Sequence, residues 1–160
     1  MQDKLITIPM STDEKKLCSI LLHYCLSFPA IKPTSGINKK LNNIDDFLKI
    51  IKTSMNTNVR NIEISFKTLE EILFYSKGIT NEFKSYAISG KSMIEEFKND
   101  IEKYYPDVVN NHSLALDILP NIRNMMEKIS MIYESNKDKH EDISEPTKSI
   151  WKKIINVIIK

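Results

Sequence analysis

Glycine and proline are scarce in this sequence. Only three glycines and six prolines occur among its 160 residues. A chain so poor in turn-forming residues is expected to make few tight turns. The scarcity therefore favours long helices over a sheet.

Long apolar runs are also missing. No stretch reaches the roughly 18 consecutive apolar residues that a membrane-spanning helix needs. The first eleven residues, MQDKLITIPMS, lack the cationic region and long apolar run of a signal peptide. We therefore expect neither a transmembrane helix nor a conventional signal peptide.

Cysteine is limited to Cys18 and Cys25, seven residues apart. On one helix this spacing corresponds to about 10 Å along the axis, which is too far for a disulfide. We expect both thiols to be small buried groups, and their number leaves the redox compartment open.

Neither sign of charge dominates. The net charge of +2 gives no strong electrostatic case for nucleic acid or an anionic membrane. Residues 61–117 carry six basic and ten acidic groups, whereas both flanking segments are basic. This pattern is typical of solvated helix faces. It also fits an acidic segment that lies against its basic neighbours or against another subunit.

Residue patterns for catalysis are absent as well. His23, His112 and His140 have no Cys or His at metal-ligand spacing, so we expect surface or half-buried rings. The sequence has no glycine-rich phosphate loop and no Gly-x-Ser-x-Gly elbow. Adjacent carboxylates such as Glu95 and Glu96 point about 100° apart on a helix and cannot share a proton or a metal. We expect a protein that is not an enzyme and holds no cofactor or metal.

What the sequence does contain is helical periodicity. Apolar residues at helical spacing predict a first helix over 12–28, which Pro29 closes. Ser11 and Glu14 have the spacing of a capping box at its start. The preceding alternation over residues 5–8 is too short to indicate a strand.

The longest periodic pattern lies in the middle of the chain. Apolar residues recur every three or four positions from Leu48 to Tyr104, and a mean near 3.5 is the period of a packed helical seam. The pattern predicts a helix over 44–104, either continuous or bent near Gly78 or Gly90. As one unbroken helix, the stripe from Leu48 to Tyr104 would be about 85 Å long. The residues expected in its packing seam are Phe66, Leu69, Leu73, Phe83, Ile94 and Phe97.

Two further helices are predicted over 114–138 and 145–159. The same three-and-four count continues into the last one, SIWKKIINVIIK. A helix lying on a membrane surface would have a broad polar face, whereas the lysines here make a narrow strip. We therefore expect Trp151, Ile154 and Ile158 to pack along the long helix.

Together these spans predict a single all-α domain over residues 1–160. Its architecture would be an elongated antiparallel helical bundle with one or two very long helices. Such a domain is expected to act through contact with other proteins, either another helical subunit or a second copy of itself, and not with nucleic acid.

The stretch TDEKKLCSILLHYCLSFP, followed by a loop and a long helix, resembles the start of the alpha-xenorhabdolysin A component. Leu26, Ser27, Phe28 and Pro29 match that family's helix exit, whereas Leu21 and Cys25 replace its tyrosine and glycine. The later LALDILPNIRNMMEKI is similar to the helix that packs back on its bundle. The resemblance covers the N-terminal half of a full toxin subunit.

This resemblance implies ClyA-like, tail-type packing in a component of a binary pore-forming toxin. Such a component assembles with a second subunit on a host membrane, and the chain would be cytosolic or secreted by a non-classical route. The family's apolar membrane-inserting hairpin has no counterpart in this sequence, so any toxin role would depend on assembly with a partner.

A second hypothesis is a compact helical adaptor or inhibitor of Bcl-2-like architecture that holds a partner helix in a groove. It requires the long stripe to be cut at Gly78 and Gly90 into separate helices. Helix boundaries at those glycines, or an exposed apolar groove, would favour this alternative. A structural helical bundle of another purpose is the third.

Overall fold

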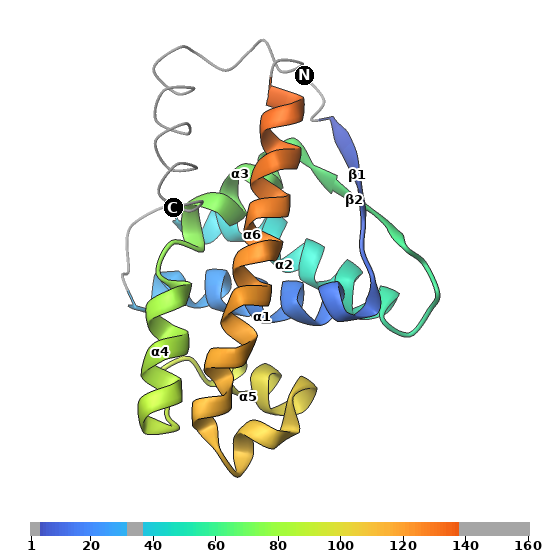
Figure 1. The fold of residues 1–160 in the computed structure, drawn as a ribbon. Coiled ribbons are helices and arrows are strands. Elements are labelled where there is room, and N and C mark those ends of the chain that lie inside the picture. Colours follow the sequence, from blue (N-terminus) through green and yellow to red (C-terminus); the bar gives the residue numbers. More distant parts are fainter. Residues whose placement is uncertain (1–3, 32–36, 138–160) are drawn as a thin grey trace.

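The structure, a computed structural model, describes residues 4–31 and 37–137. Within these residues the protein is mainly α-helical, with one small two-stranded sheet (Figure 1). The elements are β1 (Leu5–Pro9), α1 (Thr12–Ile31), α2 (Ile37–Ser54), β2 (Asn61–Ser65), α3 (Phe66–Tyr75), α4 (Ile79–Ser89), α5 (Glu95–Tyr104), the 3₁₀ helices η1 (Pro106–Val109) and η2 (His112–Leu114), and α6 (Ala115–Lys137).

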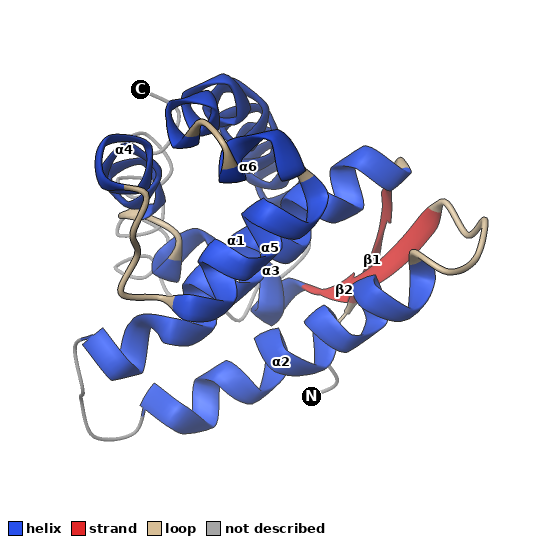
Figure 2. Cartoon of the chain, turned by 90° about the horizontal axis from the view of Figure 1, so that it is seen from below, coloured by secondary structure: helices blue, strands red, loops and turns tan. Residues whose placement is uncertain are grey.

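Helix α1 is the central element. It contacts α2, α3, α5 and α6, and Figure 2 shows the other helices grouped around it. The sequence accounts for this position because residues 17–22 of α1 are apolar except for Ser19, and all six are buried. A helix that is apolar on every side must be covered on every side.

The start of α1 has the predicted capping box. The Ser11 N–H donates to Glu14 Oε1 at 3.0 Å, and the Glu14 N–H donates to Ser11 Oγ at 3.1 Å. The helix then continues through Pro29 to Ile31, three residues beyond the predicted end. Pro29 lies in the last turn, where its missing N–H removes only one helical hydrogen bond.

The predicted helix over 44–104 is wrong. Helix α2 begins earlier, at Ile37, and ends at Ser54; β2, α3, α4 and α5 follow as separate elements. The break comes where the apolar period changes. In Asn61–Ser65 the two isoleucines are buried and their neighbours are not, which is the period of two that a strand requires.

The alternation over residues 5–8, although too short to predict a strand, lies within β1. This strand pairs antiparallel with β2, with Ile6 opposite Ile64 and Ile8 opposite Ile62. All four isoleucines are buried on one face of the ribbon. A strand this short is stable here because its partner and the core beneath it supply the pairing and the burial.

Both glycines named as weak points of the stripe mark element boundaries. Gly78 precedes α4, and Gly90 follows it with a φ of 71°, the left-handed conformation that glycine adopts without strain. The Gly90 N–H donates to the Tyr86 carbonyl at 2.7 Å and closes the helix. The stripe is thus cut into separate short helices.

The expected seam residues lie in the core, but on different elements. Phe66, Leu69 and Leu73 are on α3, Phe83 is on α4, Ile94 caps α5 and Phe97 is within α5; each is at most 3% exposed. Phe83 and Phe97 meet edge to face, with ring centroids 5.1 Å apart. The apolar periodicity therefore arises because each short helix buries one of its faces. The buried residues do not form one continuous seam.

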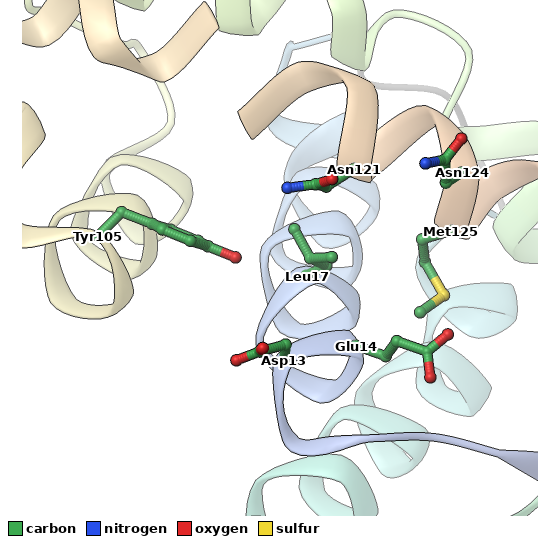
Figure 3. Close-up of a pocket in the computed structure, with 7 residues that line it drawn as sticks. All are labelled: Asp13, Glu14, Leu17, Tyr105, Asn121, Asn124 and Met125. Atoms are coloured by element: carbon green, nitrogen blue, oxygen red, sulfur yellow. The ribbon is translucent and has the colours of Figure 1, made fainter. Parts of the chain in front are cut away.

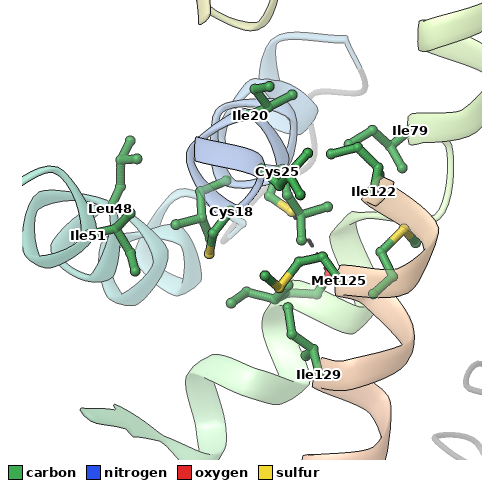
Figure 4. Close-up of a cluster of buried hydrophobic side chains, with 14 of the residues drawn as sticks. Cys18, Ile20, Cys25, Leu48, Ile51, Ile79, Ile122, Met125 and Ile129 are labelled. Atoms are coloured by element: carbon green, nitrogen blue, oxygen red, sulfur yellow. Dashed lines mark hydrogen bonds between the residues drawn. The ribbon is translucent and has the colours of Figure 1, made fainter. Parts of the chain in front are cut away.

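Figure 4 shows part of the core between α1, α2 and α6. Cys18, Cys25, Leu48, Ile122 and Met125 are buried there. Helix α6 agrees closely with the predicted span of 114–138. The predicted helix over 145–159, with Trp151, Ile154 and Ile158, lies outside the described residues.

Candidate functional site

A groove of about 540 Å³ lies between α1, α2 and the segment that leads into α5. We call it the α1–α2 groove. Its apolar lining is formed by Leu26, Leu48, Met93 and Ile94. Leu48 and Ile94 are buried, whereas Met93 is 90% exposed. The groove therefore has an apolar floor and an exposed methionine in its lining.

Helical spacing places the polar residues of the groove. His23 and Ser27 lie four residues apart on α1, and Asp45, Lys49 and Lys52 lie at steps of four and three on α2. Residues three and four apart share one face of a helix. Each helix therefore turns one polar row toward the same groove, and Glu96 adds a carboxylate from the first turn of α5.

Beneath the groove, α1 and α5 are joined by a buried polar network. Asp100 of α5 is 6% exposed, and its Oδ2 accepts a hydrogen bond from Ser19 Oγ at 2.5 Å. His23 Nδ1 lies 2.6 Å from the same oxygen. Lys52 Nζ of α2 lies 3.2 Å from the other ring nitrogen, His23 Nε2. Side chains from α1, α2 and α5 thus meet at the His23 imidazole.

The hydrogen bonds fix the tautomer of His23. A lysine ammonium can only donate, so Nε2 must accept from Lys52. The ring proton is then on Nδ1 and is donated to Asp100. In this arrangement the His23 imidazole lies between the Asp100 carboxylate and the Lys52 ammonium.

The electrostatics of Asp100 follow from the same contacts. Burial raises its pKa and is the largest single effect, but the hydrogen bonds from His23 and Ser19 together hold the pKa below its usual value. The carboxylate is therefore ionised at neutral pH. A buried charge that accepts several hydrogen bonds is a strong structural link between the elements that supply them.

The combination of Ser, His, Asp and Lys does not make this network a nucleophile site. Ser19 is fully buried and donates to a carboxylate, not to the imidazole that would act as its base. The chemistry available at the surface is that of the Lys52 ammonium and the groove lining. The groove can therefore bind another molecule, and the buried network beneath it orients His23.

A second pocket, of about 390 Å³, lies between α1 and α6 (Figure 3). Leu17 and Met125 form its apolar part, and Tyr105 points its hydroxyl toward Leu17. Burial, and then the nearby Asp13, raise the pKa of Tyr105. Glu14 is already engaged by Lys128, whose Nζ lies 2.8 Å away. The polar groups of this pocket do not converge on one point.

The remaining candidates are structural. His112 Nδ1 lies 2.7 Å from the Ala87 carbonyl and anchors η2 to the end of α4, while His140 lies outside the described residues. Both cysteines are free and buried, and burial raises the pKa of Cys18 to about 12. In the described ranges, no group of three or more His, Cys, Asp or Glu side chains could hold a metal ion.

Sequence reasoning missed the network because its parts are far apart in the chain. His23 and Asp100 are separated by 77 residues, so no local spacing connects them. One signal was present: Asp100 follows Phe97 by three residues, which places a carboxylate beside the apolar face of its helix. Among the predicted seam residues that the structure describes, Ile94 is the one that lines the groove.

Two further observations bear on the class of protein. None of the helices in the described part of the chain is long and apolar enough to cross a membrane. Comparison with protein-family models, with curated proteins and with solved structures found no match for this chain.

Proposed function

We propose that this protein is a non-enzymatic helical binding domain that holds an amphipathic helix of a partner protein in the α1–α2 groove. The observation that carries the proposal is Met93, 90% exposed beside a groove whose floor is formed by Leu48 and Ile94. Methionine is unbranched and adapts to many apolar surfaces, and it is common at helix-binding grooves.

The size and the lining of the groove support this proposal. A volume of about 540 Å³ lies within the range of pockets that enclose a ligand of moderate size. It can accept a few apolar side chains from one face of a helix. The lysines and carboxylates around the apolar floor then supply the polar rim that protein interfaces have.

The breaks at Gly78 and Gly90 also favour this function over the toxin-component alternative. The resemblance to a binary toxin subunit includes a very long helix after the first loop, and the span predicted for that helix, 44–104, is divided into separate short elements. The resemblance to the xenorhabdolysin A component stays a prediction that now depends on short sequence similarities alone, and membrane association as part of such a complex depends on it.

A selection experiment tests the proposal. A displayed library of amphipathic helices about 18 residues, or five turns, long is selected against the wild-type chain. Selected peptides are then measured by fluorescence polarisation against Met93→Asp and Ile88→Asp. Met93 is in the groove, whereas Ile88 is an equally apolar surface residue, 81% exposed, that does not line it.

The expected result is that selected peptides bind the wild type and Ile88→Asp alike and lose at least about tenfold in affinity for Met93→Asp. Exposed substitutions of this kind change the free energy of unfolding by less than about 0.5 kcal/mol, so both variants should fold. Failure to select any peptide, or equal binding to all three proteins, would contradict the proposal.

A further inference from the structure

Lys52 is the lysine of the α1–α2 groove that makes no direct ion pair within the described residues, although its charge also acts at a distance on Asp100. The other groove lysine, Lys49, pairs with Asp45 at 3.2 Å. Lys52 Nζ instead donates to a ring nitrogen, His23 Nε2. In the described part of the chain, the ion-pair distance of 4.0 Å is not met between Lys52 and any carboxylate.

The buried network holds the His23 ring in place beside Lys52. An imidazole has no negative charge with which to neutralise the Lys52 ammonium. His23 Nδ1 is held by Asp100 at 2.6 Å, and Asp100 is itself fixed by Ser19. The side chain of His23 is only 12% exposed. Nε2 is therefore a fixed acceptor that keeps one donor of the Lys52 ammonium in place and leaves two for another molecule.

From this geometry we infer that Lys52, positioned by His23, is a carboxylate-recognition subsite, and that the partner helix presents an Asp or Glu to it. The inference rests on the proposed function, because the subsite lies in the same groove. A carboxylate is a stronger acceptor for an ammonium than an imidazole nitrogen. An acid of the partner would therefore give the Lys52 ammonium a stronger acceptor than His23 Nε2.

The other charges around the groove set where that acid can lie. Glu96 is an exposed carboxylate on α5, so an acid of the partner is repelled from that side. Asp45 and Lys49 already neutralise one another. Charge complementarity therefore favours a partner helix with an acidic residue facing α2, beside the apolar residues that enter the groove.

Designed peptides about five turns long provide the probe. They carry leucines on one face and a single Glu, which is moved through the positions that flank the leucines; matched peptides carry Gln or Lys there. Binding is measured by fluorescence polarisation to the wild type, to Lys52→Gln and to Lys84→Gln. Lys84 is an exposed lysine of α4 and does not line the groove.

We expect the best Glu peptide to bind the wild type about three- to tenfold more tightly than its Gln counterpart, and the Lys peptide to bind most weakly. The advantage of Glu should persist in Lys84→Gln, disappear in Lys52→Gln, and shrink as the salt concentration is raised. Lys52 also lies in the last turn of α2, so thermal unfolding of each variant identifies any loss of fold.

The outcomes distinguish a failure of the carboxylate subsite from a failure of the proposed helix-binding function. If Glu, Gln and Lys peptides bind the wild type equally and all are weakened by Met93→Asp, the carboxylate subsite is wrong and the helix-binding groove stands. If a Glu preference is present but survives Lys52→Gln, another cation makes it and the inference is again wrong. If Met93→Asp has no effect on any peptide, the groove itself is not the binding site.

Discussion

At the scale of single residues, Gly90 is the position with the strictest local requirement. Its φ of 71° lies in the left-handed region, and a Cβ built there would be 2.8 Å from the His112 ring. We expect Gly90→Ala to lower the free energy of unfolding by about 1–3 kcal/mol, because an L-residue is strained in this conformation and the ring must also move. Urea unfolding followed by circular dichroism measures the change.

The neighbouring Lys91→Ala is the control for Gly90→Ala. Lys91 is exposed, so its truncation should change the stability by less than about 0.5 kcal/mol. Equal stability of the two variants would mean that α4 does not end in the left-handed turn.

The lowered pKa of Asp100 predicts how the stability of the fold depends on pH. The hydrogen bonds from His23 and Ser19 hold its folded-state pKa below the ordinary value of 3.8, although burial alone would raise it. A carboxyl group with a lowered pKa stabilises the folded state above its unfolded-state pKa, and this contribution is lost as the pH falls through the folded-state value. The free energy of unfolding should therefore decline below about pH 4.5.

Replacing Asp100 by Asn removes the titrating group, so the decline with acid should become shallower even if the variant is less stable at neutral pH. Asp107→Asn is the matched control, since Asp107 is exposed, and its pH profile should follow the wild type. Glu14, whose pKa is also lowered despite its burial, titrates in all three proteins. Parallel profiles for wild type and Asp100→Asn between pH 6 and pH 2 would be inconsistent with an ionised Asp100 in the folded state.

At the scale of elements, a buried lysine holds the connection between α2 and β2. Lys15 of α1 is 2% exposed, and its Nζ donates to the Ser54 carbonyl at 3.1 Å and to the Val59 carbonyl. These carbonyls end α2 and begin the approach to β2. The cation thus lies near the negative end of the α2 dipole and replaces the water that the carbonyls would otherwise bind.

We expect Lys15→Met to cost about 1–3 kcal/mol, because methionine keeps part of the apolar stem but leaves the two carbonyls without a donor. Amide hydrogen exchange at residues 55–60 should accelerate more than exchange in α6. The adjacent Lys16→Met is the control, because Lys16 makes a 3.9 Å contact with Asp13, whose side chain is 87% exposed. Similar losses in both variants would show that Lys15 is not the anchor of this connection.

The elements also show which sequence signals were sufficient. The capping box at Ser11 and the span of α6 were predictable because their signals are local. The stripe over 44–104 was misleading because a mean period near 3.5 is also produced by short helices that each bury one face. Between them, the alternation of Ile62 and Ile64 indicated a strand, but only its pairing with β1, more than 50 residues earlier, makes that strand stable.

The candidate site was less predictable than the fold. The groove needs α1, α2 and α5 to be placed together, and its network joins Ser19 and His23 to a carboxylate in another helix. Gly78 shows the same dependence on tertiary structure, because a Cβ there would collide with the Tyr24 hydroxyl. The sequence indicated a weak point in the stripe at Gly78, but not the tyrosine that approaches it.

At the scale of the whole molecule, the division of residues 44–104 decides between two overall shapes. A continuous helix over the apolar stripe would require a particle at least about 85 Å long. The elements found in that span instead pack with α1 and α6 around one core. For a compact chain of 160 residues the expected radius of gyration is about 15 Å.

Small-angle scattering coupled to size-exclusion chromatography measures this directly. We expect a radius of gyration near that of a compact domain and a scattering mass close to the chain mass of 18.6 kDa. The mass must be obtained from the same peak, because a homodimer would enlarge the radius without any change of fold. A particle of monomer mass with a maximum dimension of 85 Å or more would favour the rod, and with it the assembly of a toxin subunit. In a compact monomer, a partner would bind in a groove on the surface. The α1–α2 groove combines an apolar floor with the Lys52 ammonium, which His23 positions.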